Sequence, residues 1–478
     1  MARSSLGEVG RRYRQIVSRS SLRLEYFETP QESKPEEDLL NKESAKKVSR
    51  FLSLLRYTVY QRLYTLVILP NLVAITYLSV EKDLLHSPAT CLNAVAFNIA
   101  ATILIRQEYI INLLYRTIGC IPHWAPFAIR KRAAKLYHLG GIHSSAGVAA
   151  AIWFLLFNVA AVREWSSDIP SSKAAIATIS VSAVVVILFL QILLFSTSKF
   201  RTRYHNTWEQ IHRFAGWLLL GCFWVHLIVY NIYRSEWPQT QPIGKLFYAN
   251  PGFYTLVIST LSIMLPWLSL RRVKPRIEGL SKHAIRLHFD YASISACKTP
   301  RFATDPLFEW HSFASIPNEQ AKGFSIVISR AGDWTGNIID NPPQYLWTRG
   351  RPARGTLYMA KLFKTILCVA TGSGIAPILG LFAIPNTRFR VLWAAPNPDT
   401  TFGADVVRKV LQADPEAVIW NTRVSSRPDL VREAKRMYDE REEEIEAVFV
   451  ISNEETTTRI VYGLESKGVP AFGPIFDS

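Results

Sequence analysis

The chain has 478 residues, of which 49% are apolar, and its formal net charge is +17 at pH 7. This length exceeds that of one ordinary domain. The five cysteines are scattered without a CxxC pair, which argues against both a disulfide framework and a zinc site. No basic segment is interleaved with aromatic residues, so the positive charge does not indicate a nucleic-acid partner.

The first 50 residues are polar and lack the apolar core of a signal peptide. They predict a mostly disordered cytosolic tail that lies against the membrane surface.

Six runs without Asp, Glu, Lys or Arg follow the tail, and each approaches or exceeds the ~20 residues that cross a bilayer. They cover residues 63–80, 84–105, 136–162, 174–198, 214–233 and 246–270. Lysines and arginines concentrate in the connections between runs two and three and between runs four and five, and again after run six. Because such loops stay on the cytosolic side, we predict an integral membrane protein with six spans and both termini in the cytosol. The lipid bilayer is then the partner of much of the basic charge.

Three histidines stand in these apolar runs. His212 and His226 are fourteen residues apart, which advances a helix by about 21 Å and returns nearly to the same face. His143 enters the third run. Imidazole is a common axial ligand of haem iron, so these residues are candidate haem ligands. The alternatives are interfacial hydrogen bonding for His143 and His212, and a core histidine or an acceptor site for His226.

After Arg276 the pattern changes to strands. Residues 284–291 and 324–330 predict strands of a small β-domain, and from Phe363 strands alternate with helices, which is typical of a parallel sheet. Gly372, Gly374 and Pro377 stand where a strand passes into a helix. Such a turn either lets the backbone approach a dinucleotide pyrophosphate or is glycine-rich for steric reasons alone.

The order of these parts resembles the ferric reductase and NADPH oxidase superfamily, and most nearly its fungal branch of TmpA-like membrane flavoproteins. The resemblance covers about residues 55–478. It implies that a cytosolic nicotinamide nucleotide reduces FAD, and that electrons then pass through haem groups in the membrane.

Residue by residue, the resemblance implies that His143 and His212 hold the inner haem. The position of the second outer ligand, opposite His226, is Phe157, which cannot bind iron. One b-type haem is therefore expected, and His226 is the least secure metal ligand.

The flavin motif of the family matches His311 and Phe313, although alanine stands where the family has a hydroxyl. Thr335, in the sequence GDWT, is expected near the flavin pyrophosphate. A Cys-Gly-Pro motif near the nicotinamide is replaced by residues 452–454. The segment RGRPARG, which holds Arg349, is either a solvated loop or a contact for phosphate or lipid.

The predicted fold is an α-helical six-span membrane bundle followed by a ferredoxin-reductase-like module, with a β-barrel FAD domain and an α/β nucleotide-binding domain. The predicted domains are residues 1–50, 51–275, 276–362 and 363–478. The function expected is transfer of electrons from NAD(P)H through FAD, by way of an inner haem, to an acceptor that the sequence does not name. The alternative is a catalytically degenerate sensor or scaffold that binds a nucleotide or flavin.

Overall fold

The structure is a computed structural model, and it describes residues 12–18, 21–27, 58–166, 173–236, 242–318, 321–441 and 444–474. Most of the predicted tail lies outside these residues. Within it, β1 (Arg12–Ser18) and β2 (Ser21–Phe27) pair as an antiparallel hairpin.

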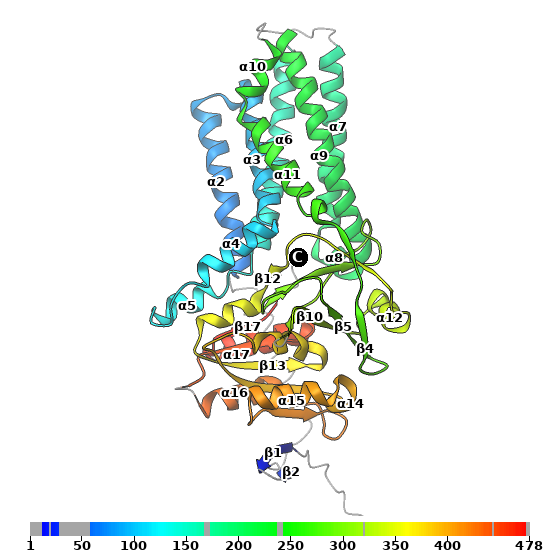
Figure 1. The fold of residues 1–478 in the computed structure, drawn as a ribbon. Helices are drawn as coiled ribbons and strands as arrows, with labels where there is room; N and C mark the ends of the chain where they lie inside the picture. The colour runs from blue at the N-terminus through cyan, green and yellow to red at the C-terminus, as the bar shows by residue number, and fades with distance from the viewer. Residues whose placement is uncertain are drawn as a thin grey trace, which may run out of the picture.

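The N-terminal part is a bundle of helices that stands above the rest of the molecule (Figure 1). Its long helices are α2 (Val59–Glu81), α3 (Pro88–Leu104), α4 (Glu108–Ile118), α6 (Gly140–Ser166), α7 (Lys173–Phe195), α9 (His205–Glu236) and α11 (Pro251–Met264). Five are long and apolar enough to cross a membrane, and the pair α3–α4, bent by 68°, makes six if it counts as one span. Length and composition thus agree with the predicted number, while the crossing itself stays a prediction.

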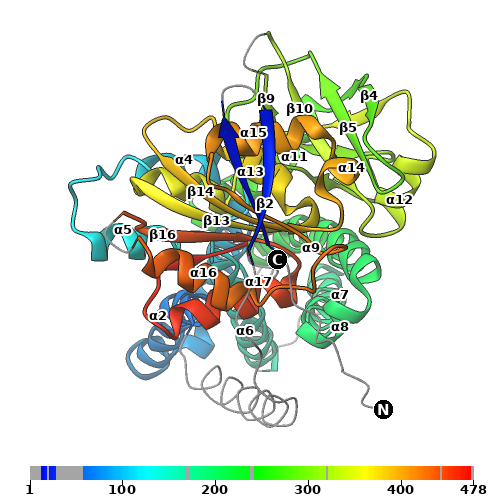
Figure 2. The same cartoon turned by 90° about the horizontal axis from the view of Figure 1, so that it is seen from below.

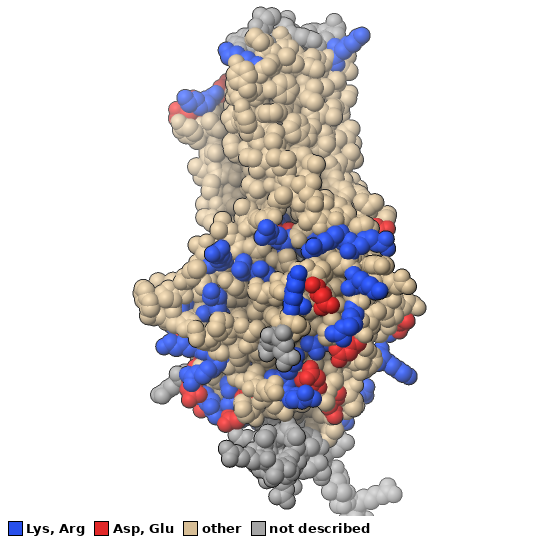
Figure 3. Space-filling model, in the orientation of Figure 1, with Lys and Arg blue, Asp and Glu red and all other residues tan. Residues whose placement is uncertain are grey.

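Short helices link the spans or follow them: α5 (Phe127–Ala133), α8 (Ser198–Arg203) and α10 (Ile243–Tyr248). Lysine and arginine side chains gather in a belt where the apolar bundle ends (Figure 3). This belt is the three-dimensional form of the basic loops in the sequence, and it is the pattern expected at the cytosolic face of a membrane.

Helix α2 buries none of its described residues fully, so a few polar contacts attach it to its neighbours. The side-chain oxygen of Asn71 accepts hydrogen bonds from Asn98 Nδ2 on α3 and from Trp153 Nε1 on α6, both at 2.8 Å. Near the other end, a Cβ added to Gly141 would overlap the carbonyl oxygen of Tyr60. Small residues and buried hydrogen bonds are the usual means by which helices associate in lipid.

The C-terminal part begins with antiparallel β-structure. One sheet has the order β4-β5-β10-β9 and a second has the order β3-β11-β7-β8. The strands are β3 (Arg271–Val273), β4 (Arg276–Gly279), β5 (Ala284–Phe289), β7 (Arg301–Ala303), β8 (His311–Ser312), β9 (Ile316–Pro317), β10 (Phe324–Ser329) and β11 (Leu346–Thr348). Strands β6 (Lys298–Thr299) and β12 (Ala353–Arg354) form a separate pair. Both strands predicted from the sequence are present as β5 and β10. Their inward residues, such as Leu287 and Ile326, are fully buried.

A five-stranded parallel sheet with the order β15-β14-β13-β16-β17 completes the chain. Its strands are β13 (Thr365–Thr371), β14 (Arg388–Ala395), β15 (Val418–Asn421), β16 (Ala447–Ile451) and β17 (Ala471–Phe472). Helices α13 (Ile375–Leu381) and α15 (Ala404–Ala413) cover one face, and α16 (Leu430–Asp439) and α17 (Glu454–Glu465) cover the other (Figure 2). A β-domain followed by a parallel α/β domain is the order predicted for the C-terminal half, and the fold prediction is confirmed there.

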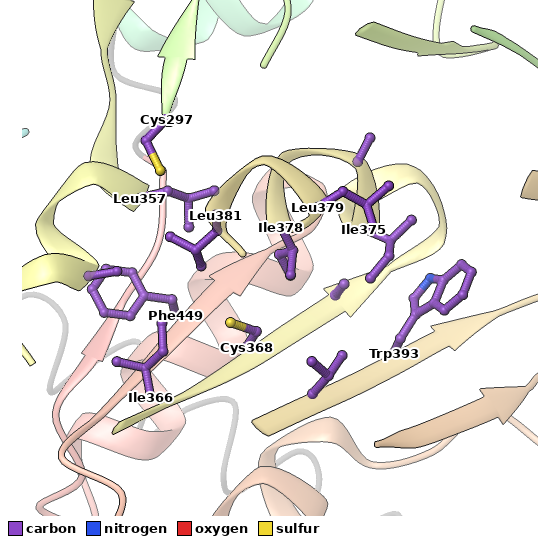
Figure 4. Packing of buried hydrophobic residues seen from close by; sticks show 14 of the residues in the cluster. Cys297, Leu357, Ile366, Cys368, Ile375, Ile378, Leu379, Leu381, Trp393 and Phe449 are labelled. Carbon is purple, nitrogen blue, oxygen red and sulfur yellow. The ribbon is translucent and has the colours of Figure 1, made fainter. Parts of the chain in front are cut away.

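The core of the α/β domain lies between β13 and α13, where Cys368, Ile375 and Ile378 meet (Figure 4). Cys297 and Cys368, which lie in this core, are buried and free.

Polar contacts join the bundle to the C-terminal part. Arg130 on α5 binds Glu446 through two hydrogen bonds of 2.9 and 3.0 Å, and Lys135 binds Glu465 on α17. Glu108, which is only 2% exposed, accepts from Arg301 Nη1 and from the backbone N of Arg351 at 2.8 Å each. The two parts therefore meet through specific paired charges.

Candidate functional site

A cavity of about 2260 Å³ lies between the helical bundle and the α/β domain. Ligand pockets for a single small molecule usually measure about 300–1,000 Å³, so this one has room for more than one such group. Its wall includes His143 and His212 from the bundle, Arg301 and Arg349 from the β-domain, and Thr457 from α17.

His143 on α6 and His212 on α9 face each other across the upper end of this cavity. Their ring centroids are 5.9 Å apart. His143 Nδ1 lies 2.9 Å from the carbonyl oxygen of Thr102, to which it donates if it carries the proton. Such a bond fixes the tautomer and leaves Nε2 as the atom that can bind a metal. Trp208, one turn before His212, stacks on the second imidazole at 5.9 Å.

This geometry fits a haem held by two imidazoles. Metal–nitrogen bonds of about 2 Å, added to the radius of each ring, place two opposed imidazole centroids roughly 6 Å apart. Arg106, which also lines the cavity, stands close enough to His143 to interact with it electrostatically. A cationic side chain beside the histidines suits a porphyrin, which carries carboxylates. His143 and His212, which the sequence predicted as the two ligands of the inner haem, thus lie close together in the structure.

His226 has a different environment. Its Nε2 lies 3.0 Å from Ser182 Oγ, and its ring packs against Phe157 and Phe154 at 5.0 and 5.5 Å. Both phenylalanines are fully buried, and the pocket that touches His226 has a volume of only about 30 Å³. A haem does not fit there. The prediction of His226 as a metal ligand is not supported, because packed aromatic rings fill the position where a second haem would lie.

The residues predicted for flavin lie around Trp334, and each of them has a partner within the protein. His311 stacks on Trp334 with centroids 4.1 Å apart, and Phe313 lies 5.9 Å from the same indole. Thr335 Oγ1 accepts hydrogen bonds from the backbone N of Ala331 and of Gly332. It therefore caps α12 (Asp333–Asp340). None of these three predicted residues lines the large cavity. Each of these side chains has a partner within the protein, and their role in binding flavin stays a prediction.

The glycine turn serves two purposes. Gly372 has a φ of +51°, and nothing lies within 4 Å of a Cβ added there, so its backbone is open to a ligand. A Cβ added to Gly374 would instead overlap the carbonyl oxygen of Ile451 at the end of β16. Pro377 lies within α13. Gly374 is thus required by packing, while Gly372 remains the candidate for close approach of a nucleotide.

We expect Gly374→Ala to destabilise the α/β domain by about 2 kcal/mol or more, because backbone atoms must move to admit the methyl group. Gly372→Ala should cost only about 1 kcal/mol, the usual strain of an L-residue at positive φ. Thermal unfolding of the purified protein measures both. Equal stability of the two variants would show that the contact with Ile451 is not a constraint.

At the carboxyl edge of the parallel sheet, Thr371, which the sequence did not single out, joins Ser452 and Asn453 of the segment that replaces the Cys-Gly-Pro motif. The sheet extends from β13 in both directions, toward β14 and toward β16, and the crevice at such a topological switch point is where nucleotides bind in open α/β sheets. There the hydroxyls of Thr371 and Ser452 are hydrogen-bonded to each other. The next residue, Asn453, caps α17 by accepting from the backbone N of Thr456 at 2.9 Å. Glu454, the first residue of α17, lines the large cavity, so the cavity reaches the start of this helix. Thr371, Gly372 and Ser452 do not line it.

Comparison with known proteins points to one group. A family model described as "Adenylate-forming reductase 03009, C-terminal domain" matches residues 356–478. Adenylate-forming reductase 03009 of Coprinopsis cinerea is 39% identical over 422 residues, which are 88% of this chain and 40% of that protein. Adenylate-forming reductase 06235 of the same organism is 37% identical over 471 residues, 98% of this chain and 45% of that protein. The chain spans less than half the length of either relative.

The similarity of the chain to solved structures is weaker than its similarity to these relatives. A ferredoxin NADP+ reductase from Neisseria gonorrhoeae with bound FAD and NADP is 13% identical, covers 43% of this chain and 99% of its own, and has a TM-score of 0.36. A flavohemoglobin from Malassezia yamatoensis with bound FAD and heme is 11% identical, covers 80% of this chain and 98% of its own, and has a TM-score of 0.37.

The resemblance to the ferric reductase and NADPH oxidase superfamily was wrong as an assignment. The family model and both curated relatives point to adenylate-forming reductases instead. Histidine spacing in apolar helices and the order of a β-domain before an α/β domain are coarse features, and they did not distinguish these groups.

Proposed function

We propose that the chain is a membrane-bound oxidoreductase module that takes electrons from a reduced nicotinamide nucleotide and delivers them to a haem held by His143 and His212. The observation that carries this proposal is the continuity of the large cavity, which is lined at one end by the two histidines and at the other by α17. Separate sites would have to be joined by conformational change, whereas a shared cavity lets two redox groups approach directly.

The nucleotide end of the proposal is supported by the switch point between β13 and β16. Gly372 leaves the backbone open there, and α17 begins beside it with a capped N-terminus, which favours negative charge. The curated relatives are named reductases, and the family model that matches this region describes their C-terminal domain. We assign the corresponding part of this chain a reductase role.

A flavin is the third group of the proposal. When bound, it accepts two electrons from a nicotinamide and releases them one at a time to a one-electron carrier. The volume of the cavity is sufficient for a flavin ring beside a haem. His311, Phe313 and Thr335 are not assigned to it, since none of them lines the cavity and their contacts are with Trp334 and with backbone N–H groups.

In this proposal, individual residues of the bundle have separate roles around the haem. The carbonyl of Thr102 orients His143, and the indole of Trp208 stacks on His212. The aromatic rings of Phe154 and Phe157 close the outer half of the bundle. We therefore place the electron acceptor, a membrane-embedded or small molecule, on the inner side, next to the cavity. In this proposal the helices span the membrane six times and both termini face the cytosol.

A second candidate function is a sensor or scaffold that binds a nucleotide without catalysis. The engagement of His311, Phe313 and Thr335 in local packing favours it, because the residues predicted for flavin are satisfied without a ligand.

Visible absorption of the protein purified in detergent tests the proposal. The wild type should show a Soret band, and anaerobic addition of NADPH should reduce both flavin and haem. His212→Ala should abolish the Soret band because the iron loses an axial ligand. His205→Ala, at the start of the same helix and outside the cavity wall, is the matched control and should retain it. A colourless wild type that binds nucleotide would favour the sensor, and a Soret band that survives in His212→Ala would exclude the proposed ligand.

A further inference from the structure

Arg349 occupies an unusual position in the cavity wall. It follows β11, and its guanidinium lies between the indole rings of Trp267 and Trp310, at 4.0 and 4.3 Å from their centroids. Trp267 comes from the end of the bundle and Trp310 from the β-domain. Stacking on two aromatic faces fixes the plane of a guanidinium and leaves its N–H groups pointing outward along its edges.

Those N–H groups are not satisfied within the protein. Nε and Nη1 of Arg349 are shielded from solvent, and no described residue accepts a hydrogen bond from either atom. A buried donor without a partner costs free energy, and the cost is larger for a charged group. Burial, together with the nearby Arg301 and Arg213, lowers the pKa of Arg349 to about 10. The unsatisfied guanidinium of Arg349 therefore lowers the stability of the folded protein as long as no ligand binds it.

Neighbouring arginines do not share this condition. Arg301 is paired with Glu108, and Arg213 is paired with Glu209. Among the residues that the structure describes, Arg349 forms no ion pair with a carboxylate. Glu108 and Glu209 act on Arg349 electrostatically, but they are paired with Arg301 and Arg213. The cavity wall therefore contains an oriented guanidinium without an ion pair of its own among the described residues.

We infer that Arg349 is an anion-binding residue of the cavity and that its fork of N–H groups binds carboxylate or phosphate oxygens of the ligand. A guanidinium can bind two such oxygens at once through two parallel N–H groups. This bidentate contact requires a defined orientation of the guanidinium, and the two indoles provide it. The anion has two possible sources, the carboxylates of a porphyrin and the phosphates of a dinucleotide. The identity of the ligand rests on the proposed function, whereas the anion site itself does not.

Titration of the ligand-free full chain in neutral-lipid nanodiscs tests the inference. The probes are hemin and FAD, each beside a counterpart without the anionic group, hemin dimethyl ester and riboflavin. Arg349→Met should weaken binding of one anionic probe by about 10- to 100-fold, the effect of losing a charge-assisted hydrogen bond. The uncharged counterpart of that probe should bind the variant and the wild type alike. Loss with hemin identifies carboxylate as the anion, and loss with FAD identifies phosphate.

Arg354→Met is the matched control. Arg354 also stacks on an aromatic ring, that of Tyr358 at 4.6 Å, and its Nε is likewise buried without a partner, but it does not line the cavity. It should bind every probe as the wild type does. Arg349→Lys keeps the positive charge and loses the fork, so an intermediate affinity is expected in a chain whose melting temperature matches the wild type.

Two results would overturn the inference: equal affinity of Arg349→Met and the wild type for both anionic probes, or a wild type that binds neither anionic probe more tightly than its uncharged counterpart. Failure of the proposed function looks different. It would leave the Soret band unchanged in His212→Ala, or leave NADPH unable to reduce the protein, while Arg349 still discriminated anionic from uncharged probes.

Discussion

Replacing Arg130 by methionine is expected to lower the free energy of unfolding by about 3 kcal/mol and to loosen the C-terminal part from the bundle. The side chain of Arg130 is 6% exposed and binds both carboxylate oxygens of Glu446. It also donates to the carbonyl oxygens of Leu362 and Ala125. Removing it takes a donor from two carbonyls and leaves the buried side of the Glu446 carboxylate with the hydrogen bond from the backbone N of Lys364. This loss costs more than the ion pair itself contributes.

Thermal unfolding and limited proteolysis of the purified protein would measure this effect. Arg132→Met, two residues further along α5 and exposed, is the control and should unfold like the wild type. An Arg130→Met variant with unchanged melting temperature and unchanged cleavage would show that this contact does not hold the two parts together.

The same contact predicts a dependence on pH. Burial tends to raise the pKa of Glu446, but hydrogen bonds from Arg130 and from the backbone N of Lys364 outweigh it, and the pKa is lowered from its ordinary 4.5. A carboxyl whose pKa is depressed by folding stabilises the fold above its unfolded pKa. That contribution disappears as the pH falls through the folded pKa. The wild type should therefore exceed Glu446→Gln in stability at pH 7, and the difference should shrink below about pH 4.5.

Replacing Phe157 by histidine is expected to leave the haem content at one per chain and to lower the free energy of unfolding by about 3 kcal/mol. From the sequence alone, the missing ligand is the obvious reason for a lost outer haem. In the structure the surroundings of His226 are packed as well, by Phe154, Phe157 and Tyr230, with a hydrogen bond from Ser182. A new imidazole would be buried without a partner and without space for a porphyrin beside it.

Haem-to-protein stoichiometry and melting temperature would test this expectation. Phe157→Leu keeps the site apolar and should lose less stability than Phe157→His. Two haems per chain in a stable Phe157→His variant would mean that the missing ligand alone emptied the outer site.

Local patterns in the sequence predicted the helices and strands. The alternation of apolar residues at 285, 287 and 289 predicts the strand that the structure has as β5, because the period of side chains along a strand is two. The charge-free runs predict the long helices, with α2 continuous through Pro70. In both cases the signal lies in consecutive residues and needs no knowledge of distant contacts.

The sequence patterns did not predict which residues the individual polar side chains contact. Glu108 is two residues from Arg106, yet its carboxylate binds Arg301, which is 193 positions away in the chain. His311, Phe313 and Thr335 carry a motif, but their rings and hydroxyl are committed to Trp334 and to a helix cap. In the sequence, the segment of Arg349 is either a solvated loop or a contact for phosphate or lipid. In the structure, two indoles from other parts of the chain stack on its guanidinium. Whether a polar side chain is free for a ligand depends on what packs against it, and spacing in the sequence does not record that.

By itself the sequence predicted the long apolar helices and the strand pattern of the C-terminal part, since fixed helical and strand periods carry this information. The pairing of His143 with His212 came from the family resemblance and not from these periods. Only the tertiary structure decided that a single cavity joins the histidines to the start of α17, that His226 is enclosed by aromatic rings, and that Arg349 keeps unsatisfied donors. These properties arise where segments far apart in the chain pack together, and the free energy of burying or pairing a polar group is set by those neighbours.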